Sequence, residues 1–366
     1  MKLLLVSGIY PPDIGGPASS IPRFARFLKN HGNTVEILTL KDSKRSPVKH
    51  PWLVNYVARD QFLFLRILKT VIFINKKLKN IDAVYVNGLI QESAFAIKIK
   101  SYSKKSVVKL VSDPVWERAV NKNETTLGVI DFNKSNLRFK HWCQRVILVW
   151  SLNQFHQVIC PSEQLLEIIK GWKVKTPVTL ILNGVSITEN RPVEKKFDLI
   201  TVCRLIPLKN CNLMIDACKE IGATLAIVGS GPDENYLRKL AGDYNEIKFF
   251  GDQSFEEILD LLNSSRIYMN LSSHEGLSYA LLEAMSCGLP SIVSNIEGNK
   301  AVIKDMQEGL IVNYNDAYQI RSAIVMLLES RSLRESFGKA AKDKIQGFYS
   351  DNVQFKKIYD LLLEIS

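Results

Sequence analysis

Two carboxylates in one short segment are the residues of this chain best placed to do chemistry. Residues 274–290 read HEGLSYALLEAMSCGLP, with Glu275 in a loop and Glu283 inside an apolar helical pattern. A helix that begins near Leu277 places Glu283 about two turns further along. The free N–H groups at such a helix start favour a phosphate or a sugar oxygen. Because a carboxylate binds hydroxyl groups but not phosphate, the segment suits a nucleotide sugar; the alternative is an ordinary amphipathic helix with one solvated Glu.

Two cations follow another strand-like run, at residues 199–202. The segment 203–210 reads CRLIPLKN, in which Arg204 offers a planar fork for phosphate oxygens and Lys209 a point charge. Cations at this place would stabilise the diphosphate of such a ligand, which would make a metal ion dispensable. The alternative is a pair of solvated surface cations.

Glycine-rich turns follow three further strand-like runs. Residues 10–18 read YPPDIGGPA, residues 228–232 VGSGP and residues 250–253 FGDQ. The adjacent Gly15 and Gly16 let the backbone approach a ligand closely, and their N–H groups can face a diphosphate. A plain tight turn explains two adjacent glycines equally well.

Together these segments resemble the signatures of the retaining glycosyltransferases of family 4. The resemblance also includes CPSE at 160–163 and NGV at 183–185, and it extends over nearly the whole chain. It implies that Glu275 holds the donor sugar's hydroxyl groups and Glu283 the ribose hydroxyls. It further implies that the backbone of Gly276, Leu277 and Ser278 faces sugar and phosphate, and that the nucleotide base is recognised near Gly251.

An acidic residue in the N-terminal half has two interpretations. Residues 110–118 read LVSDPVWER, and Asp113 stands where many family members carry a histidine. The segment is similar to a subgroup with a D-x-x-W-E pattern, which implies that Asp113 orients the acceptor hydroxyl or acts as a base. Asp113 equally suits the N-cap of the following helix, and the sequence leaves both roles open.

The elements that must position these residues alternate between strands and helices, which is typical of doubly wound α/β domains. We expect strands at 1–6, 34–40, 83–86, 107–111, 157–160 and 178–182, and a helix over 21–30. A second series of strands is expected at 199–202, 224–228, 247–249, 267–271, 291–293 and 309–312. The fold class is therefore α/β, and the resemblance implies the GT-B fold, with two Rossmann-like domains facing across a cleft.

Domain boundaries follow from composition. Residues 189–196, ENRPVEKK, have the composition of a linker. We expect an N-terminal acceptor-binding domain over 1–188 and a C-terminal donor-binding domain over 189–366. The amphipathic helix at about 351–366 is expected to pack back on the first domain.

Composition limits the class of protein. The 366 residues are 46% hydrophobic and 23% charged, as in globular proteins, and no window approaches twenty uninterrupted apolar residues. The apolar N-terminus lacks a signal-peptide cleavage site, which favours a buried first strand. The six cysteines show no metal-ligand spacing and are typical of reduced thiols in a cytoplasmic protein. We therefore expect no metal and no cofactor.

Charge is distributed unevenly along the chain. Residues 1–190 hold 28 Lys and Arg against 13 Asp and Glu, whereas the remainder is slightly acidic. Such a basic half suits nucleic acid, anionic lipid or a phosphorylated acceptor, or serves only solubility. Residues 62–77, FLFLRILKTVIFINKK, form either a core helix or one that rests on a membrane surface. Since no nucleic-acid motif is present, we expect no nucleic acid but peripheral association with the inner face of the cytoplasmic membrane.

The resemblance implies a hexosyltransferase-type enzyme, EC 2.4. It would move a sugar from a nucleotide-diphospho-sugar to a saccharide or lipid-linked acceptor, with retention of the anomeric configuration. The setting would be the synthesis of lipopolysaccharide, another cell-surface polysaccharide or a glycolipid. Two alternatives are a nucleotide-sugar epimerase of GT-B architecture and a non-catalytic protein that binds membrane or nucleic acid.

Overall fold

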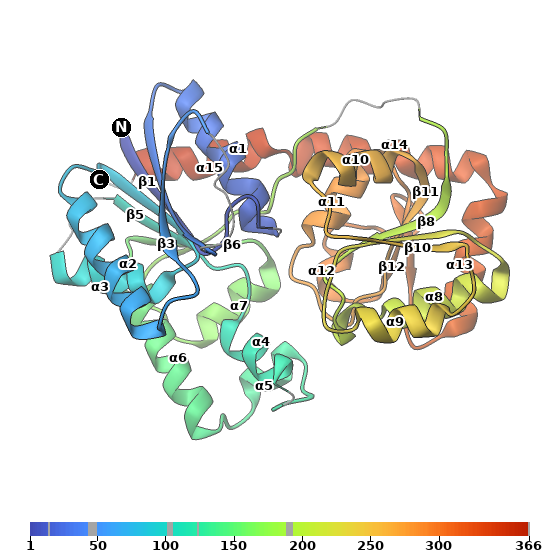
Figure 1. The fold of residues 1–366 in the computed structure, drawn as a ribbon, viewed down its shortest axis with the longest axis horizontal. Coiled ribbons are helices and arrows are strands. Elements are labelled where there is room, and N and C mark those ends of the chain that lie inside the picture. The colour runs from blue at the N-terminus through green and yellow to red at the C-terminus, as the bar shows by residue number, and fades with distance from the viewer. Residues whose placement is uncertain (14, 43–49, 101–104, 123, 188–192, 365–366) are drawn as a thin grey trace. The chain divides into compact units, whose positions relative to one another are not determined.

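The chain folds into two α/β units. The computed structural model describes residues 1–366 except 14, 43–49, 101–104, 123, 188–192 and 365–366 (Figure 1). The first unit comprises Met1–Leu182 and Gln354–Ser366, and the second comprises Asn183–Val353. Each contains one wholly parallel sheet, which confirms the prediction of two Rossmann-like domains. The predicted boundary between residues 188 and 189, and the linker as far as residue 192, lie outside the described residues; the second unit begins at Asn183.

The sheet of the first unit has seven parallel strands in the order β3-β2-β1-β4-β5-β6-β7. The strands are β1 (Lys2–Ser7), β2 (Thr34–Lys41), β3 (Leu53–Ala58), β4 (Ala83–Asn87), β5 (Lys105–Lys109), β6 (Gln157–Cys160) and β7 (Val178–Leu180). The helices are α1 (Gly16–Asn30), α2 (Leu63–Leu78), α3 (Ile90–Lys100), α4 (Pro114–Asn121), α5 (Val129–Lys134), α6 (Phe139–Leu152) and α7 (Glu163–Gly171). Helix α15 (Asp351–Glu364) begins in the second unit and belongs to the first from Gln354 on.

Burial on both faces explains why the first strand reads as an unbroken apolar run. Leu3, Leu4, Leu5 and Val6 of β1 are all fully buried, as expected for a central parallel strand. The odd-numbered residues join a core with α1 and α15, in which the rings of Phe24 and Phe355 lie 5.1 Å apart. The C-terminal helix therefore completes the first unit.

Two elements of the first unit differ from the sequence prediction. The edge strand β3 was not predicted, because it is mostly half-buried and shows no clear alternation. Helix α1 begins at Gly16 and not at residue 21. Its first turn contains Pro17, where the missing N–H is harmless because that group has no partner within the helix.

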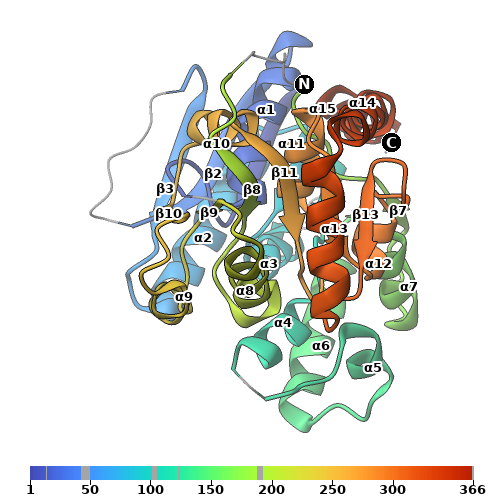
Figure 2. The same cartoon turned by 90° about the vertical axis from the view of Figure 1, so that its right-hand side faces the viewer.

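The sheet of the second unit has six parallel strands in the order β10-β9-β8-β11-β12-β13 (Figure 2). The strands are β8 (Phe197–Val202), β9 (Leu225–Val228), β10 (Ile247–Gly251), β11 (Ser265–Asn270), β12 (Ser291–Ser294) and β13 (Gly309–Val312). The helices are the 3-10 turn η1 (Pro207–Lys209), α8 (Cys211–Ile221), α9 (Glu234–Ala241), α10 (Phe255–Asn263), α11 (Tyr279–Ser286), α12 (Glu297–Lys300), α13 (Ala317–Glu329) and α14 (Arg331–Phe348).

This strand order is that of a Rossmann sheet. The chain adds β9 and β10 on one side of β8 and then adds β11, β12 and β13 on its other side, so the switch point lies between β8 and β11. Ligands of open α/β sheets bind beyond the carboxyl ends of the strands at such a switch point. All six strands of this sheet were predicted within two residues of their observed ends. Helix α11 begins at Tyr279, two residues later than expected, because the Ser278 hydroxyl accepts the N–H of Leu281 and caps the helix.

No helix in the described part of the chain combines the length and the apolar character needed to cross a membrane.

Candidate functional site

The loops that leave β8, β11 and β12 meet at one edge of the second sheet. The three strands are adjacent and parallel, so their carboxyl ends lie side by side. The loop after β8 carries Arg204 and Lys209, and the loop after β11 carries Glu275. This edge therefore brings together residues that lie about seventy positions apart in the sequence.

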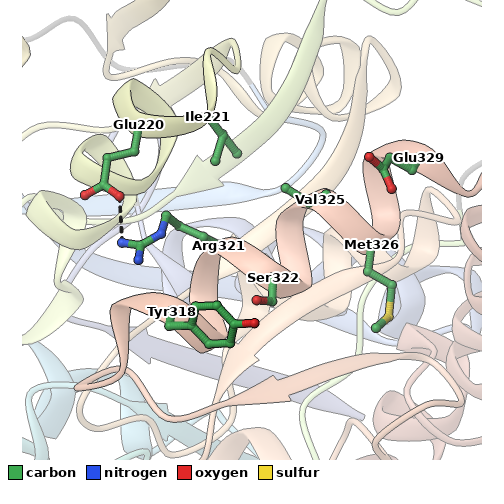
Figure 3. A pocket seen from close by; sticks show the side chains of 8 residues that line it. All are labelled: Glu220, Ile221, Tyr318, Arg321, Ser322, Val325, Met326 and Glu329. Carbon is green, nitrogen blue, oxygen red and sulfur yellow. Dashed lines mark ion pairs between the residues drawn. The ribbon is translucent and has the colours of Figure 1, made fainter.

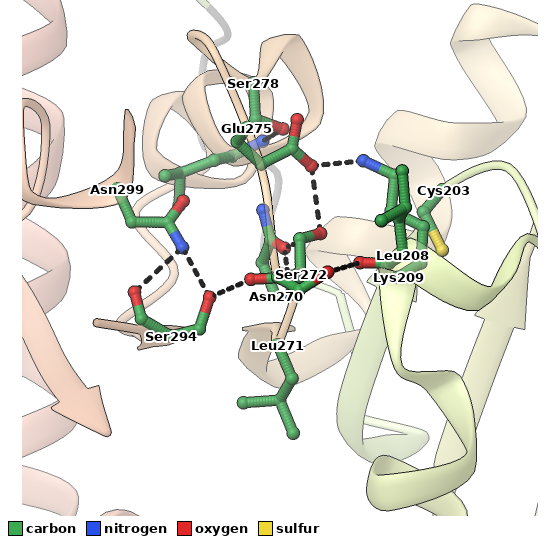
Figure 4. Close-up of polar contacts among 12 residues, drawn as sticks. Cys203, Leu208, Lys209, Asn270, Leu271, Ser272, Glu275, Ser278, Ser294 and Asn299 are labelled. Atoms are coloured by element: carbon green, nitrogen blue, oxygen red, sulfur yellow. Dashed lines mark hydrogen bonds and ion pairs between the residues drawn. The ribbon is translucent and has the colours of Figure 1, made fainter. Parts of the chain in front are cut away.

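Lys209 and Glu275 form an ion pair between these two loops (Figure 4). Their side chains are 19% and 14% exposed, so the pair is sheltered but reachable from solvent. Burial alone would lower the pKa of Lys209, but the Glu275 carboxylate more than compensates, and the net effect raises it. Lys209 is therefore a fixed positive charge at neutral pH.

Backbone contacts hold the two loops together. The N–H of Ser273 donates to the carbonyl of Leu208 at 2.9 Å, and the side-chain amide of Asn210 donates to the carbonyl of Leu271 at 2.8 Å. Asn210 adopts the left-handed conformation, with φ 50°, between η1 and α8. The separation of Lys209 from Glu275 is therefore set by main-chain atoms as well as by the ion pair itself.

A buried polar network supports the Glu275 loop from beneath. The Ser272 hydroxyl lies 3.0 Å from Glu275 Oε1 and 2.6 Å from Asn270 Oδ1. The Ser294 hydroxyl donates to the carbonyl of Ser272, and the amide of Asn299 donates to Ser294. Sequence analysis missed these residues. Their signal was the cluster of small polar side chains at the ends of two strand-like runs.

Helix α12 contacts the same loop through Gly298. A Cβ atom at this position would lie 2.1 Å from the carbonyl oxygen of Glu275 and 2.6 Å from that of Gly276. Only a residue without a side chain allows this approach. A side chain at this position would therefore push α12 and the Glu275 loop apart.

Arg204 is exposed on the loop that also carries Lys209. Within the described residues its guanidinium makes neither a hydrogen bond nor an ion pair, so its donors are open to a ligand. Its neighbour Cys203 has its sulfur 3.5 Å from that of Cys211 at the start of α8. The carbonyl of Cys203 packs on Gly229, where a Cβ atom would approach to 2.0 Å. The turn after β9 therefore supports the basic loop.

The other predicted donor-binding residues of the second unit line the same edge. Gly251 ends β10 with φ 65° and accepts the N–H of Gly229 at 2.8 Å. Leu277 is 8% exposed, and its carbonyl accepts the amide of Asn183 at 3.1 Å. Glu283 lies buried in the second turn of α11. The seven donor-binding residues predicted in this unit are therefore at strand ends, in the loops that follow them or in the first two turns of a helix.

The predicted glycine loop belongs to the first unit. Gly15 has φ 141° and precedes α1, and Gly16 is the first residue of that helix. Residue 14 of this loop lies outside the described residues. Asp13 forms a 2.5 Å salt bridge with Arg59, which ties the loop to the end of β3. Both glycines thus stand at a helix N-terminus that follows a parallel strand.

Asp113 is a helix cap. Its Oδ1 accepts the N–H groups of Val115 and Trp116, at 3.0 and 3.3 Å. Its Oδ2 accepts from Asn133 at 2.9 Å and from Arg145 at 2.6 Å. The Asp113 side chain is fully buried, and both oxygens are used inside the protein. Of the two interpretations that the sequence left open, the structure therefore supports the helix cap.

Metal-ligating groups are not assembled in the described part of the chain, where no three His, Cys, Asp or Glu side chains are placed to hold an ion. All six cysteines are free thiols. The pKa of His274, the neighbour of Glu275, is lowered. Burial is the main cause, and the positive charge of Lys209 adds to it. The Glu275 carboxylate raises the pKa of His274 and offsets these two effects only in part.

A surface pocket lies at another place on the second unit (Figure 3). It is bounded by the last residues of α8 and by α13, and an ion pair of 2.7 Å joins Arg321 to Glu220 across it. Because Glu220 stands near the carboxyl end of α8, about 14 Å from the helix start that adjoins Lys209, the pocket is not part of the Lys209–Glu275 site.

Two family models match the chain in succession. Residues 14–189 match the model described as Glycosyltransferase Family 4, and residues 186–344 match Glycosyl transferases group 1. The chain belongs to glycosyltransferase family 4. The two matches meet near the border between the structural units, so the family assignment covers both.

Known proteins extend this assignment. An uncharacterized glycosyltransferase of Methanocaldococcus jannaschii is 33% identical over 195 residues, which are 49% of this chain and 50% of the relative. The UDP-Gal:alpha-D-GlcNAc-diphosphoundecaprenol alpha-1,3-galactosyltransferase of Escherichia coli is 29% identical over 213 residues, 51% of this chain and 54% of the relative. The alignment thus spans about half the length of these two relatives.

The fold has close counterparts among solved structures. The Anabaena protein HepE in complex with UDP and glucose has a TM-score of 0.77 at 17% identity, with 100% of each chain covered. At this identity the likeness concerns the fold alone. It confirms that this glycosyltransferase has the GT-B fold.

Proposed function

We propose that this glycosyltransferase moves a sugar from a nucleotide-diphospho-sugar to a saccharide or lipid-linked acceptor, with retention of the anomeric configuration. The observation that carries the proposal is the Lys209–Glu275 pair at the switch point of the second sheet, with the exposed Arg204 on the same loop as Lys209. Two cations and one carboxylate at the same edge match a ligand that has an anionic diphosphate and a neutral, hydroxyl-rich sugar.

We propose a role for each of these residues from its charge. During transfer the bond between the anomeric carbon and the β-phosphate oxygen breaks, and the acceptor oxygen bonds to that carbon. The electron pair of the broken bond stays on the departing diphosphate, and the acceptor hydroxyl releases a proton. Arg204 and Lys209 would neutralise the new negative charge, which is the work that a metal ion does in other enzymes. Glu275 would accept hydrogen bonds from sugar hydroxyls.

The ion pair also prepares the site. In the structure Lys209 is held by Glu275, so its ammonium group is already in position before a donor arrives. A group fixed in advance does not have to reorganise when charge develops on the leaving diphosphate. Gly15 and Gly16, at the N-terminus of α1, remain predicted donor-binding residues of the first unit.

The test is thermal stabilisation by a panel of UDP-, GDP-, ADP- and dTDP-sugars. A ligand at a hundred times its dissociation constant adds about 2.7 kcal/mol. For a unit of this size, about 2–4 °C per kcal/mol gives a rise of about 5–11 °C. One base class should produce this rise. The variant Arg204→Ala should reduce it, whereas Arg331→Ala, which replaces an exposed arginine at the start of α14, should not.

Several outcomes decide the proposal. No stabilisation by any donor, or equal stabilisation of both arginine variants, would contradict it. Unchanged transfer after treatment with a chelator is expected, since no step uses a metal. Loss of activity under that treatment would refute the metal-free mechanism.

The setting proposed is the synthesis of a cell-surface polysaccharide, such as lipopolysaccharide, or of a glycolipid. The name of the Escherichia coli relative refers to a diphosphoundecaprenol-linked acceptor. A lipid-linked acceptor agrees with the excess of basic residues in the N-terminal half of the chain. We propose that the protein is cytoplasmic and peripheral on the inner face of the membrane.

A further inference from the structure

Three helices of the first unit turn apolar side chains toward solvent. In most surface helices the polar stripe faces water and the apolar stripe faces the core. In α2, α3 and α6 large hydrophobic residues lie on the outward side as well. Scattered exposed apolar residues are common, but a contiguous set is not.

Helix α2 shows two opposite stripes. Thr70, Val71, Ile74 and Leu78 are buried toward the rest of the unit. Leu65, Leu68 and Ile72 recur at helical spacing on the other side and are 48%, 43% and 44% exposed. Phe62, Leu63 and Phe64 at the helix start are 73%, 56% and 66% exposed. The core of the first unit therefore buries only some of the apolar residues in this segment.

Helices α3 and α6 expose further apolar residues. Phe95 and Ile99 of α3 are 44% and 67% exposed. Phe139 and Trp142 of α6 are 79% and 53% exposed, and their rings stack with centroids 6.0 Å apart. Val146 and Ile147, one turn further along α6, are also about half exposed.

The three helices are neighbours. Helix α3 contacts α2 on one side and α6 on the other, and the rings of Phe95 and Trp150 approach to 4.7 Å across the second contact. The exposed apolar residues therefore lie on three neighbouring helices of the first unit. We call this set the apolar face; its members are Phe62, Leu63, Phe64, Leu65, Leu68, Ile72, Phe95, Ile99, Phe139, Trp142, Val146 and Ile147.

The three helices of this face carry several cations and almost no carboxylate. Across the sequences of α2, α3 and α6 the single carboxylate is that of Glu92, which is buried. Exposed cations stand among the apolar residues, at Lys69 and Lys76 of α2 and Lys98 of α3. A surface that combines large apolar side chains with cations, and exposes no carboxylate from its own helices, matches an anionic interface.

We propose that the apolar face docks on a lipid bilayer with anionic headgroups. Aromatic and aliphatic side chains enter the boundary between headgroups and acyl chains, and the lysines contact phosphate groups. A second copy of this chain fits the face less well, because its cations would oppose the same cations. The inference deepens the proposed function, since docking would bring the first unit to the membrane that holds a lipid-linked acceptor. The apolar face itself is independent of any donor.

The experiment is sedimentation of the full chain with vesicles. One set contains phosphatidylcholine alone, and the other an equal mixture of phosphatidylcholine and phosphatidylglycerol. Strong, salt-sensitive binding to the anionic set is expected. The paired variant Lys69→Gln with Lys76→Gln should bind about thirty-fold more weakly, because each lysine near an anionic surface contributes about five-fold.

Matched variants separate the apolar face from general properties of the protein. Phe139→Ser with Trp142→Ser should reduce binding to both vesicle sets, whereas Tyr318→Ser with Phe348→Ser, equally exposed residues of the second unit, should not. The pair Lys239→Gln with Lys248→Gln removes the same charge from exposed positions of the second unit and should leave most binding intact. All variants should melt like the unmodified protein, since the replaced side chains are exposed.

Three results would overturn the inference: no binding to either vesicle set, equal loss in control and face variants, or self-association that the face variants abolish. The last would assign the face to a second copy. Donor-induced thermal stabilisation is measured on the same variants. If vesicle binding fails while that stabilisation persists, the membrane surface is wrong and the glycosyltransferase proposal stands; the reverse pattern refutes the proposed donor site alone.

Discussion

The contact between Gly298 and the Glu275 loop allows a quantitative prediction for Gly298→Ala. The added methyl carbon would start 2.1 Å from the carbonyl oxygen of Glu275. Separations under 3.0 Å do not occur for real Cβ atoms, so the two groups must part by at least about 0.9 Å. Both partners are backbone, and no flexible side chain can take up the movement. The Glu275 loop, α12, or both must shift.

Two magnitudes follow from this displacement. Overpacking of this kind costs about 1–3 kcal/mol of stability. In a unit of this size the melting temperature would fall by about 2–12 °C. Because a misplacement of about 1 Å at a reacting group costs about a hundred-fold in rate, sugar transfer should fall by that order.

The assay compares melting, affinity for the nucleoside diphosphate and affinity for the intact nucleotide sugar, using the base class that stabilises the unmodified protein. Gly298→Ala should weaken binding of the nucleotide sugar more than that of the diphosphate, since the displaced residue is proposed to face the sugar. Gly347→Ala is the matched control. Nothing lies within 4 Å of a Cβ atom at that position of α14, so alanine there should be neutral or stabilise by up to about 1 kcal/mol.

A Gly298→Ala protein that melts and binds donor like the unmodified one would refute this reasoning. It would mean that α12 is free to move away from the loop and does not set the position of Glu275. Equal loss of affinity for diphosphate and nucleotide sugar would instead place Glu275 outside the sugar contacts.

Two further predictions concern the first unit. Asp113→Ala removes a helix cap and leaves the buried Arg145 guanidinium without its carboxylate; chemical denaturation should show a loss of about 3–5 kcal/mol, and a loss below 1 kcal/mol would contradict the structural role. The Glu124 carboxylate accepts from Lys140 and His141, which lowers its pKa to about 2 from an ordinary 4.5. Since the folded pKa is the lower one, this stabilisation is complete above pH 4.5 and is lost as the pH falls toward 2. Glu124→Gln should flatten the fall in melting temperature across that window, and an unchanged profile would assign the acid sensitivity to other carboxylates.

The strands were the most predictable part of the fold. A central parallel strand is buried on both faces, so runs such as residues 3–6 are recognisable in the sequence as apolar blocks between turns. Where burial is partial the signal fades, as in β3, which lies at the sheet edge and was missed. The start of α11 was displaced by two residues, because Ser278, and not the first apolar residue, caps the helix.

The sequence predicted the residue types of the candidate site, but not the residues that hold them in place. Arg204, Lys209 and Glu275 stand in segments whose spacing resembles a family signature. The network of Asn270, Ser272 and Ser294 beneath them has no spacing rule, because it joins the ends of different strands. Asp113 illustrates the opposite case, since an acid in a family-like segment proved to be a buried cap.

The sequence alone determined the two α/β units, the family, and the charged residues of the candidate site. These follow from local patterns: apolar blocks, turn residues and short motifs. Only the tertiary structure decided that Lys209 pairs with Glu275, that Gly298 contacts the Glu275 loop, and that the neighbouring helices α2, α3 and α6 all expose apolar residues. The physical reason is that strand order and helix packing bring together residues far apart in the chain, and no local pattern encodes which distant loops become neighbours.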